Sequence, residues 1–196
     1  MSRGSGGSTG ATPVGGAGGF VALGEVEVYR GSLISVGRGR FSGPDGTVFE
    51  REVVHHPGAV VVVPLLDHKR ALLVRQYRAA VGAWMLELPA GKRDVSGEPT
   101  EVTAERELAE EVGRRPGHLE LLGCFYTSPG FCDERTWIYL AKDLVEVPDD
   151  RQGIEEQAMT LQEVRLADLA ELVASGELVD AKSIVGLSLA AGRVGA

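Results

Sequence analysis

Apolar residues in the first half of the chain come in short runs that turn residues separate. Four such runs predict β-strands, at 25–36, 48–55, 59–66 and 71–78. A Ser-Gly-Pro-Asp-Gly turn at 42–46 lies between the first two runs. Residues 60–63 are four consecutive valines, apolar at every position rather than at every second one. Because a strand of this kind is covered on both faces, we expect it at the centre of a sheet.

The period changes to that of a helix over residues 99–112. Proline stands at the first position, acidic residues occupy the first turn and Gly113 follows the last one. At about 100° per residue, two sets of side chains fall on opposite arcs. The apolar arc holds Val102, Leu108, Ala109 and Val112, and the acidic arc holds Glu107, Glu110 and Glu111. Glu105 falls near the apolar arc, which leaves it either partly exposed or paired.

The rest of the chain alternates strand and helix patterns. We expect strands at 119–126, 136–141 and 159–165, and helices at 166–174 and 181–191, the second begun by Asp180. Strands, one helix, further strands and final helices predict an α/β fold with a mixed sheet between helices. Residues 1–19 hold eight glycines and almost nothing that could be buried, which predicts a flexible tail before one domain at 20–196.

Length and charge exclude several classes of protein. The 196 residues, 43% of them hydrophobic, suffice for one sizeable core. The net charge of -8 would repel a phosphate backbone, so nucleic acid is not an expected partner. No apolar run approaches the roughly 20 residues needed to cross a bilayer, which predicts no membrane partner and a cytoplasmic location. Two cysteines, Cys124 and Cys132, indicate neither a zinc site nor a disulfide framework.

The acidic arc of the 99–112 helix is the strongest chemical signal. Its three carboxylates lie within five residues and repel one another by roughly a few tenths of a kcal/mol per i,i+4 pair. Within the predicted helix, no basic residue stands at that spacing from Glu107 or Glu111. Hard oxygen ligands of this kind suit Mg²⁺ or Mn²⁺, with substrate phosphates and waters completing the shell. The alternative is a solvated acidic helix face.

The whole string from Gly91 to Arg114 resembles the Nudix box. That box reads Gly, five residues, Glu, seven residues, Arg-Glu, an aliphatic residue, any residue, Glu-Glu, any residue, Gly and an aliphatic residue. Two departures stand out: six residues separate Gly91 from Glu98, and Arg114 occupies the closing aliphatic position. Neither changes an expected metal ligand. The resemblance implies a Nudix α/β/α sandwich with additional N-terminal antiparallel strands.

The same resemblance implies roles for residues of the box. Glu107 and Glu111 become the main ligands of Mg²⁺, or alternatively Mn²⁺, assisted by Glu110 and by the carbonyl of Ala90. Arg106 would hold the loop through Glu98 or a neighbouring carboxylate.

Segments outside the box resemble ADP-ribose pyrophosphatases of this superfamily. The matching segments are 75–78, 87–91 and a Ser-Pro-Gly turn whose proline lies sixteen residues after Gly113. They imply a nucleoside diphosphate substrate contacted by Arg78, with Arg75 behind it, and by Pro129 and Gly130. Taken alone, the turn would be an ordinary loop.

Further roles follow from this subgroup. In similar enzymes a glutamate on a mobile loop deprotonates water, and Glu156, or its neighbour Glu155, stands at that place. Solvated loop charges are the alternative. N-terminal strands of such enzymes pair or swap within a homodimer, which implies the same assembly here.

Three other functions remain open at the level of sequence. The substrate could be another nucleotide sugar or a dinucleotide, because the box binds the shared diphosphate and not its ends. The domain could sense ADP-ribose without turnover, or it could be an interaction protein with an unmetallated acidic helix. Trp84 and Trp137 could stack on adenine, although packing in the core is the commoner fate of tryptophan.

Overall fold

The computed structural model describes residues 18–195. The predicted flexible tail at 1–19 therefore lies, apart from its last two glycines, outside the described residues. Contacts divide the chain into two compact units, the first ending at Val54 and the second beginning at His55.

The first unit is a three-stranded sheet in the order β1 (Val21–Arg30), β2 (Ser35–Ser42) and β3 (Val48–His55). The prediction of one strand over 25–36 is wrong, because the chain reverses at Gly31, whose amide donates to the carbonyl of Ile34 at 2.8 Å. The predicted turn at 42–46 is confirmed. In that turn, Asp45 accepts a hydrogen bond from the Thr47 amide at 2.9 Å.

The strands of the second unit form a four-stranded sheet, a three-stranded sheet and a two-stranded pair. The four-stranded sheet is mixed, in the order β7 (Ala90–Lys92), β4 (Ala59–Pro64), β10 (Arg135–Lys142) and β9 (His118–Tyr126), with β4 and β10 parallel. The three-stranded sheet is antiparallel, in the order β12 (Thr160–Arg165), β5 (Arg70–Arg78) and β6 (Ala83–Glu87). Two short strands, β8 (Arg114–Arg115) and β11 (Val145–Glu146), pair with each other.

Helices follow the predicted order, with one short helix in addition. They are α1 (Thr100–Val112), α2 (Gly153–Gln157), α3 (Leu169–Ala174) and α4 (Ala181–Val194). Helix α1 begins after Pro99 and ends at Gly113, whose φ of 65° is readily adopted by glycine. Asp180 caps α4 by accepting from the Ser183 amide at 2.9 Å. Within residues 18–195, no helix has the length and apolar character needed to span a membrane.

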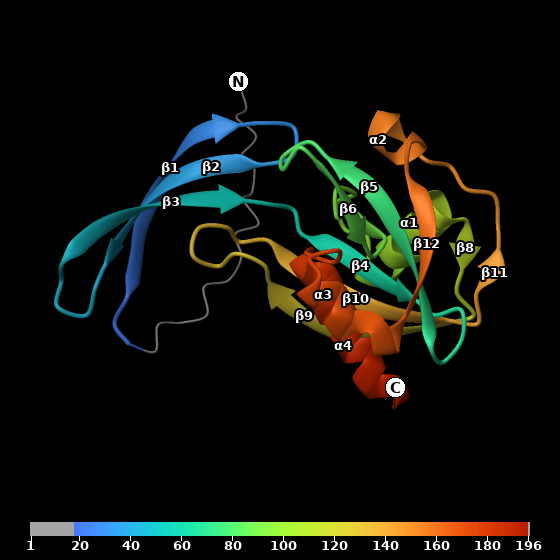
Figure 1. Cartoon of the computed structure of the whole chain (residues 1–196). Coiled ribbons are helices and arrows are strands. Elements are labelled where there is room, and N and C mark those ends of the chain that lie inside the picture. Colours follow the sequence, from blue (N-terminus) through green and yellow to red (C-terminus); the bar gives the residue numbers. More distant parts are fainter. Residues whose placement is uncertain (1–17, 196) are drawn as a thin grey trace, which may run out of the picture. The chain divides into compact units, whose positions relative to one another are not determined.

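Strand β4 separates two layers of core, as the four valines predict. Val60 and Val62 pack with residues of α1, whereas Val61 and Val63 pack with residues of α4. All four are fully buried, so the expectation of a central strand covered on both faces is confirmed. Helices α1 and α4 therefore cover opposite faces of the mixed sheet (Figure 1).

The orientation of α1 differs from the prediction in two places. Val102, expected on the apolar arc, is 49% exposed, and Glu111, expected on the acidic arc, is only 4% exposed. The buried stripe of this helix runs through Thr103, Ala104, Leu108, Glu111 and Val112. Glu105 is exposed. Helical periodicity alone could not place Glu111, because it cannot show that a backbone amide outside the helix binds this carboxylate.

Candidate active site

Arg106 binds three carboxylates of the candidate site. Its guanidinium donates to Glu107 at 2.7 Å, to Glu110 at 3.1 Å and to Glu98 at 3.2 Å. Thr103 adds a hydrogen bond to Glu98 at 2.7 Å. Arg106 thus ties the loop that precedes α1 to the helix itself. It binds Glu107 from the adjacent position, a contact that the i,i+4 spacing does not reveal.

Glu111 lies deeper, one turn beyond Glu107. Its carboxylate accepts a hydrogen bond from the amide of Ala90 at 3.1 Å, so β7 and α1 meet at this side chain. A side chain at Gly91 would overlap the carboxylate of Glu107. The backbone of 90–91 therefore packs directly against the acidic face of the helix, which is the close approach that the glycine permits.

Burial leaves both acids in an environment that disfavours their charge. Desolvation raises the pKa of Glu107 to about 7, although Arg106 opposes the rise. Desolvation and the charge of Glu107 raise the pKa of Glu111 to about 8, although the Ala90 hydrogen bond lowers it. Two buried carboxylates with perturbed pKa values beside each other are typical of a functional site.

Glu156 belongs to the same electrostatic neighbourhood. Its charge contributes to the raised pKa of both Glu107 and Glu111. It lies on α2, where its carboxylate accepts a hydrogen bond from the amide of Gln152 at 2.7 Å. Glu155, the neighbouring candidate, is exposed on the same short helix. Glu156 therefore lies near enough to the acids of α1 for their charges to interact, although α2 lies far beyond α1 in the sequence.

Arg78 is held in place by a buried carboxylate, that of Glu87. Its guanidinium donates to both carboxylate oxygens of Glu87, at 2.8 Å and 2.7 Å, and Glu87 is 2% exposed. This hydrogen bonding raises the pKa of Arg78, and the charge of Glu111 adds to the rise. Arg75 instead contacts Gln162 at 3.2 Å and Glu177 at 3.1 Å. The two arginines thus have separate surroundings, and the electrostatic link to Glu111 belongs to Arg78.

Pro129 and Gly130 form the exposed tip of the hairpin between β9 and β10. The amides of Phe131 and Cys132 donate to the carbonyl of Ser128, at 3.1 Å and 2.9 Å, which closes the turn. These hydrogen bonds stay within the hairpin. The predicted substrate contacts of Pro129 and Gly130 remain predictions.

The oxygen atoms of the predicted metal ligands suit a hard divalent ion, but they do not converge on one position. Among residues 18–195, no group of three or more His, Cys, Asp or Glu side chains is arranged to hold a metal ion. Glu107 and Glu110 are turned onto Arg106 instead. Their oxygens, together with those of Glu111 and the Ala90 carbonyl, are the type that Mg²⁺ and Mn²⁺ accept. A divalent cation would also offset the buried charge of Glu107 and Glu111.

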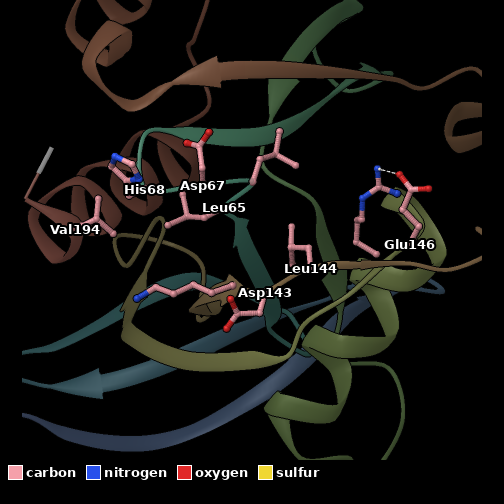
Figure 2. A pocket seen from close by; sticks show the side chains of 10 residues that line it. Leu65, Asp67, His68, Asp143, Leu144, Glu146 and Val194 are labelled. Carbon is pink, nitrogen blue, oxygen red and sulfur yellow. Dashed lines mark ion pairs between the residues drawn. The ribbon is translucent and has the colours of Figure 1, made fainter.

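A cavity of about 530 Å³ lies elsewhere in the second unit (Figure 2). Its lining combines apolar and charged side chains from the ends of β4 and β10, among them Leu65, Lys142 and Leu144. Arg114, the residue that departs from the box, also lines this cavity and pairs with Glu146 at 2.9 Å. None of the predicted site residues lines it, so this cavity is separate from the candidate active site.

Comparison with known proteins identifies the class. The NUDIX domain matches residues 55–184, which is most of the second unit, and the chain belongs to this family. The resemblance carried by the box is thus confirmed.

The similar proteins include two named enzymes. The chain is 38% identical to an ADP-ribose pyrophosphatase of Bacillus subtilis over 157 residues, 80% of this chain and 84% of that protein. It is also 38% identical to an ADP-ribose pyrophosphatase of Mycobacterium tuberculosis over 168 residues, 86% of this chain and 81% of that protein. The predicted resemblance to ADP-ribose pyrophosphatases is confirmed.

A solved structure bears on the fold alone. The crystal structure of an ADP compounds hydrolase aligns with a TM-score of 0.77 at 24% identity, covering 90% of this chain and 94% of that one. The predicted α/β fold with a mixed sheet and additional antiparallel strands is confirmed.

Reasoning from sequence missed two side chains that organise the site. Glu87 belongs to the matching segment 87–91 and has no predicted role, yet it is the buried partner of Arg78. Arg151 has no predicted role either, yet its guanidinium donates to the carbonyl of Glu111 at 3.1 Å. A single arginine amid Asp149, Asp150 and Glu155 was the available signal, since a lone cation in an acidic segment often has a structural partner.

Proposed function

We propose that the chain hydrolyses ADP-ribose to AMP and ribose 5-phosphate with the help of a divalent metal ion. The observation that carries this proposal is the buried pair of Glu107 and Glu111 against the backbone of 90–91, within a matched NUDIX domain. Two relatives named as ADP-ribose pyrophosphatases, each matched over more than four fifths of their length, support the choice of substrate.

Nudix hydrolases generally need a divalent metal ion, and the proposed ion here is Mg²⁺, with Mn²⁺ as the alternative. Glu107 and Glu111 would hold it, assisted by Glu110 and the carbonyl of Ala90. When bound, such an ion neutralises diphosphate oxygens and lowers the pKa of a water molecule. Desolvation raises the pKa of Glu107 and of Glu111, and a cation bound to both would lower these pKa values by favouring the charged forms.

The protein's own residues carry the remaining steps. Glu156, or Glu155 beside it, accepts a proton from water as the water oxygen bonds to one phosphorus. The bridging bond from that phosphorus to oxygen breaks, and the departing phosphate keeps the electron pair. Arg78 contacts a phosphate or the ribose, with Arg75 behind it, and Pro129 and Gly130 border the substrate. Arg106 keeps the loop and the helix together through Glu98.

The decisive experiment compares two glutamine variants of α1. We expect Glu111→Gln to lower Mg²⁺-dependent turnover of ADP-ribose at least about a hundredfold, because removal of a charged group that stabilises the transition state has effects of this size. Glu105→Gln is the matched control, since Glu105 is exposed on the same helix. Circular dichroism checks that both variants fold. Near-normal activity of Glu111→Gln would contradict the ligand assignment.

Three further measurements distinguish the other possible functions. A panel of nucleotide sugars and dinucleotides, scored by release of the nucleoside monophosphate, tests whether ADP-ribose is preferred. Tight binding of ADP-ribose with no product over hours would indicate a sensor. Failure of Mg²⁺ and Mn²⁺ to raise the melting temperature would indicate an interaction protein with an unmetallated helix.

We also propose a homodimer that involves the first unit, in a cytoplasmic protein. All ten residues of β1 are exposed in the single chain, including the apolar side chains Val21, Leu23, Val26, Val28 and Tyr29. An edge strand with so many exposed apolar groups is a surface that a second chain can cover.

A further inference from the structure

The segment that carries Glu155 and Glu156 has little to hold it in place. Helix α2 spans five residues, and none of them is buried. Ile154, its one large apolar side chain, is 87% exposed. Helices this short gain little stability from their own hydrogen bonds. Apart from the approach of α2 to β5, the position of the two glutamates therefore depends on contacts at the ends of the segment.

Arg151 makes those contacts. Its guanidinium donates to the carbonyl of Glu111 at 3.1 Å through Nε and to the carbonyl of Met159 at 2.7 Å through Nη1. Asp149 pairs with the same Nε at 3.0 Å. Met159 is buried beside residues of α1, so it forms a fixed point at the far end of the segment. One side chain thus joins both ends of 151–159 to the helix.

The contact with α1 is favourable for a general reason. The last carbonyls of a helix lack partners within the helix, and the partial negative charge there attracts cations. The carbonyl of Glu111 lies in this last turn, and the amide of Asp150 donates to the neighbouring carbonyl of Glu110 at 3.1 Å. The segment is consequently docked on the same two residues whose side chains belong to the candidate site.

We propose that Arg151 is a positioning residue, which fixes the segment bearing Glu155 and Glu156 relative to the acids of α1. This inference rests on the proposed function, because it assigns Arg151 a part in placing the general base. Arg151 itself touches no reacting group. Its effect passes through the backbone of 151–159 to Glu156, whose charge already influences Glu107 and Glu111.

Arg114 provides a matched control. It also donates to a carbonyl at the end of α1, that of Gly113 at 3.0 Å, and it pairs with a carboxylate, that of Glu146. Its side chain is 23% exposed, against 20% for Arg151. None of its described contacts reaches 151–159. Arg114→Met therefore removes the same kind of interaction without releasing the segment.

The kinetic test uses Arg151→Met and Arg114→Met with ADP-ribose and Mg²⁺. We expect Arg151→Met to lower kcat about tenfold or more with little change in KM, because small misplacements of reacting groups have large kinetic effects. The kcat of Arg114→Met should stay within about twofold of the wild-type value, because substitutions away from the site usually have small effects. Equal losses in both variants would overturn the proposal.

A double variant tests whether the effect passes through the base. In whichever of Glu155→Gln and Glu156→Gln loses turnover, adding Arg151→Met should lower kcat by less than about a further twofold, because two changes on one route are not additive. A full multiplicative loss would show that Arg151 acts elsewhere, and would overturn the proposal.

Hydrogen exchange tests the anchor without turnover. Amides of 151–159 should exchange faster in Arg151→Met than in the wild type or Arg114→Met, while those of α4 keep their protection. Unchanged exchange in 151–159 would overturn the anchoring role. If the wild type does not hydrolyse ADP-ribose, the proposed function fails and the placement of a base fails with it. The exchange result would still decide whether Arg151 anchors the segment.

Discussion

The two units of the chain solve the problem of burying a sheet in different ways. In the second unit, helices cover the mixed sheet on both faces, and Val60 to Val63 are fully buried. In the first unit, the three-stranded sheet carries a small aromatic cluster. The ring centroid of Phe49 lies 5.6 Å from that of Phe41 and 6.2 Å from that of Phe20. Strand β1 buries none of its residues. Similar sheet-forming patterns can thus end in very different degrees of burial.

This difference teaches where stability and assembly are decided. A sheet with helices packed on its faces buries its apolar side chains within one chain. A three-stranded sheet without such helices buries little apolar area by itself. We therefore expect substitutions in the second unit to change folding, and substitutions in β1 to change association.

The largest effect should come from the core beneath the candidate site. Leu108→Ala removes a fully buried side chain of α1 and should lower the free energy of unfolding by about 2–5 kcal/mol. Val48→Ala, at a position of the first unit that is 49% exposed, should change it by less than about 0.5 kcal/mol. Urea denaturation measures both. Equal losses would contradict the contrast between the units.

Association should respond next. Val26→Asp puts a charge on β1 at a position that is 69% exposed and should raise the dimer dissociation constant at least about tenfold, roughly 1.4 kcal/mol. Val145→Asp is the matched control, because Val145 is 63% exposed in the second unit. Sedimentation over a range of concentrations gives both constants. A wild-type chain that stays monomeric throughout would refute the proposed dimer.

The smallest effect distinguishes two aspartates that each accept a backbone hydrogen bond at 2.9 Å. Asp180 caps α4 and is 8% exposed, and Asp180→Ala should lower the free energy of unfolding at pH 7 by about 1 kcal/mol. Asp45 does the same in an exposed turn of the first unit, and Asp45→Ala should cost less. Chemical denaturation of both variants and the wild type supplies the comparison.

The contribution of Asp180 should also depend on pH. Although burial opposes the shift, Lys182 and Ser183 hold the pKa of Asp180 below its ordinary value of 3.8. A folded pKa below the unfolded one means that the stabilisation is complete above pH 3.8 and is lost as pH falls through the folded pKa. The difference between the wild type and Asp180→Ala should shrink on acidification below 3.8. A difference that grows there would contradict this account.

Several features of the fold could be predicted because local chemistry determines them. Pro99 and Gly113 mark the ends of α1, Asp180 marks the start of α4, and four valines identify the central strand. The prediction overlooked the turn at Gly31, although a Gly-Ser pair is typical of turns, because strand-forming residues such as Tyr29 and Ile34 stand on both sides. Short strands such as β6 and β7 carry too few residues for a period to appear.

The candidate site was predictable in composition and less so in arrangement. Helical spacing indicated Glu107, Glu110 and Glu111 as a group, and the resemblance to the Nudix box implied that Arg106 holds the loop through Glu98 or a neighbouring carboxylate. Spacing could not indicate that Glu111 is buried, because the amide that binds it comes from Ala90 on another element. Nor could it indicate the contacts of Arg151 or the pairing of Arg78 with Glu87, which join residues through the tertiary fold.

Gly91 limits where the loop between Gly91 and Glu98 can vary in length. The volume that a side chain would need there is already taken by the carboxylate of Glu107. An extra residue in the loop therefore has to be accommodated farther along, where Gly97 adopts a φ of 78° and a side chain would meet open space. The backbone beside the helix thus stays fixed while the outer bend has room for an additional residue, which separates the chemistry of the site from the length of the loop within one short stretch of chain.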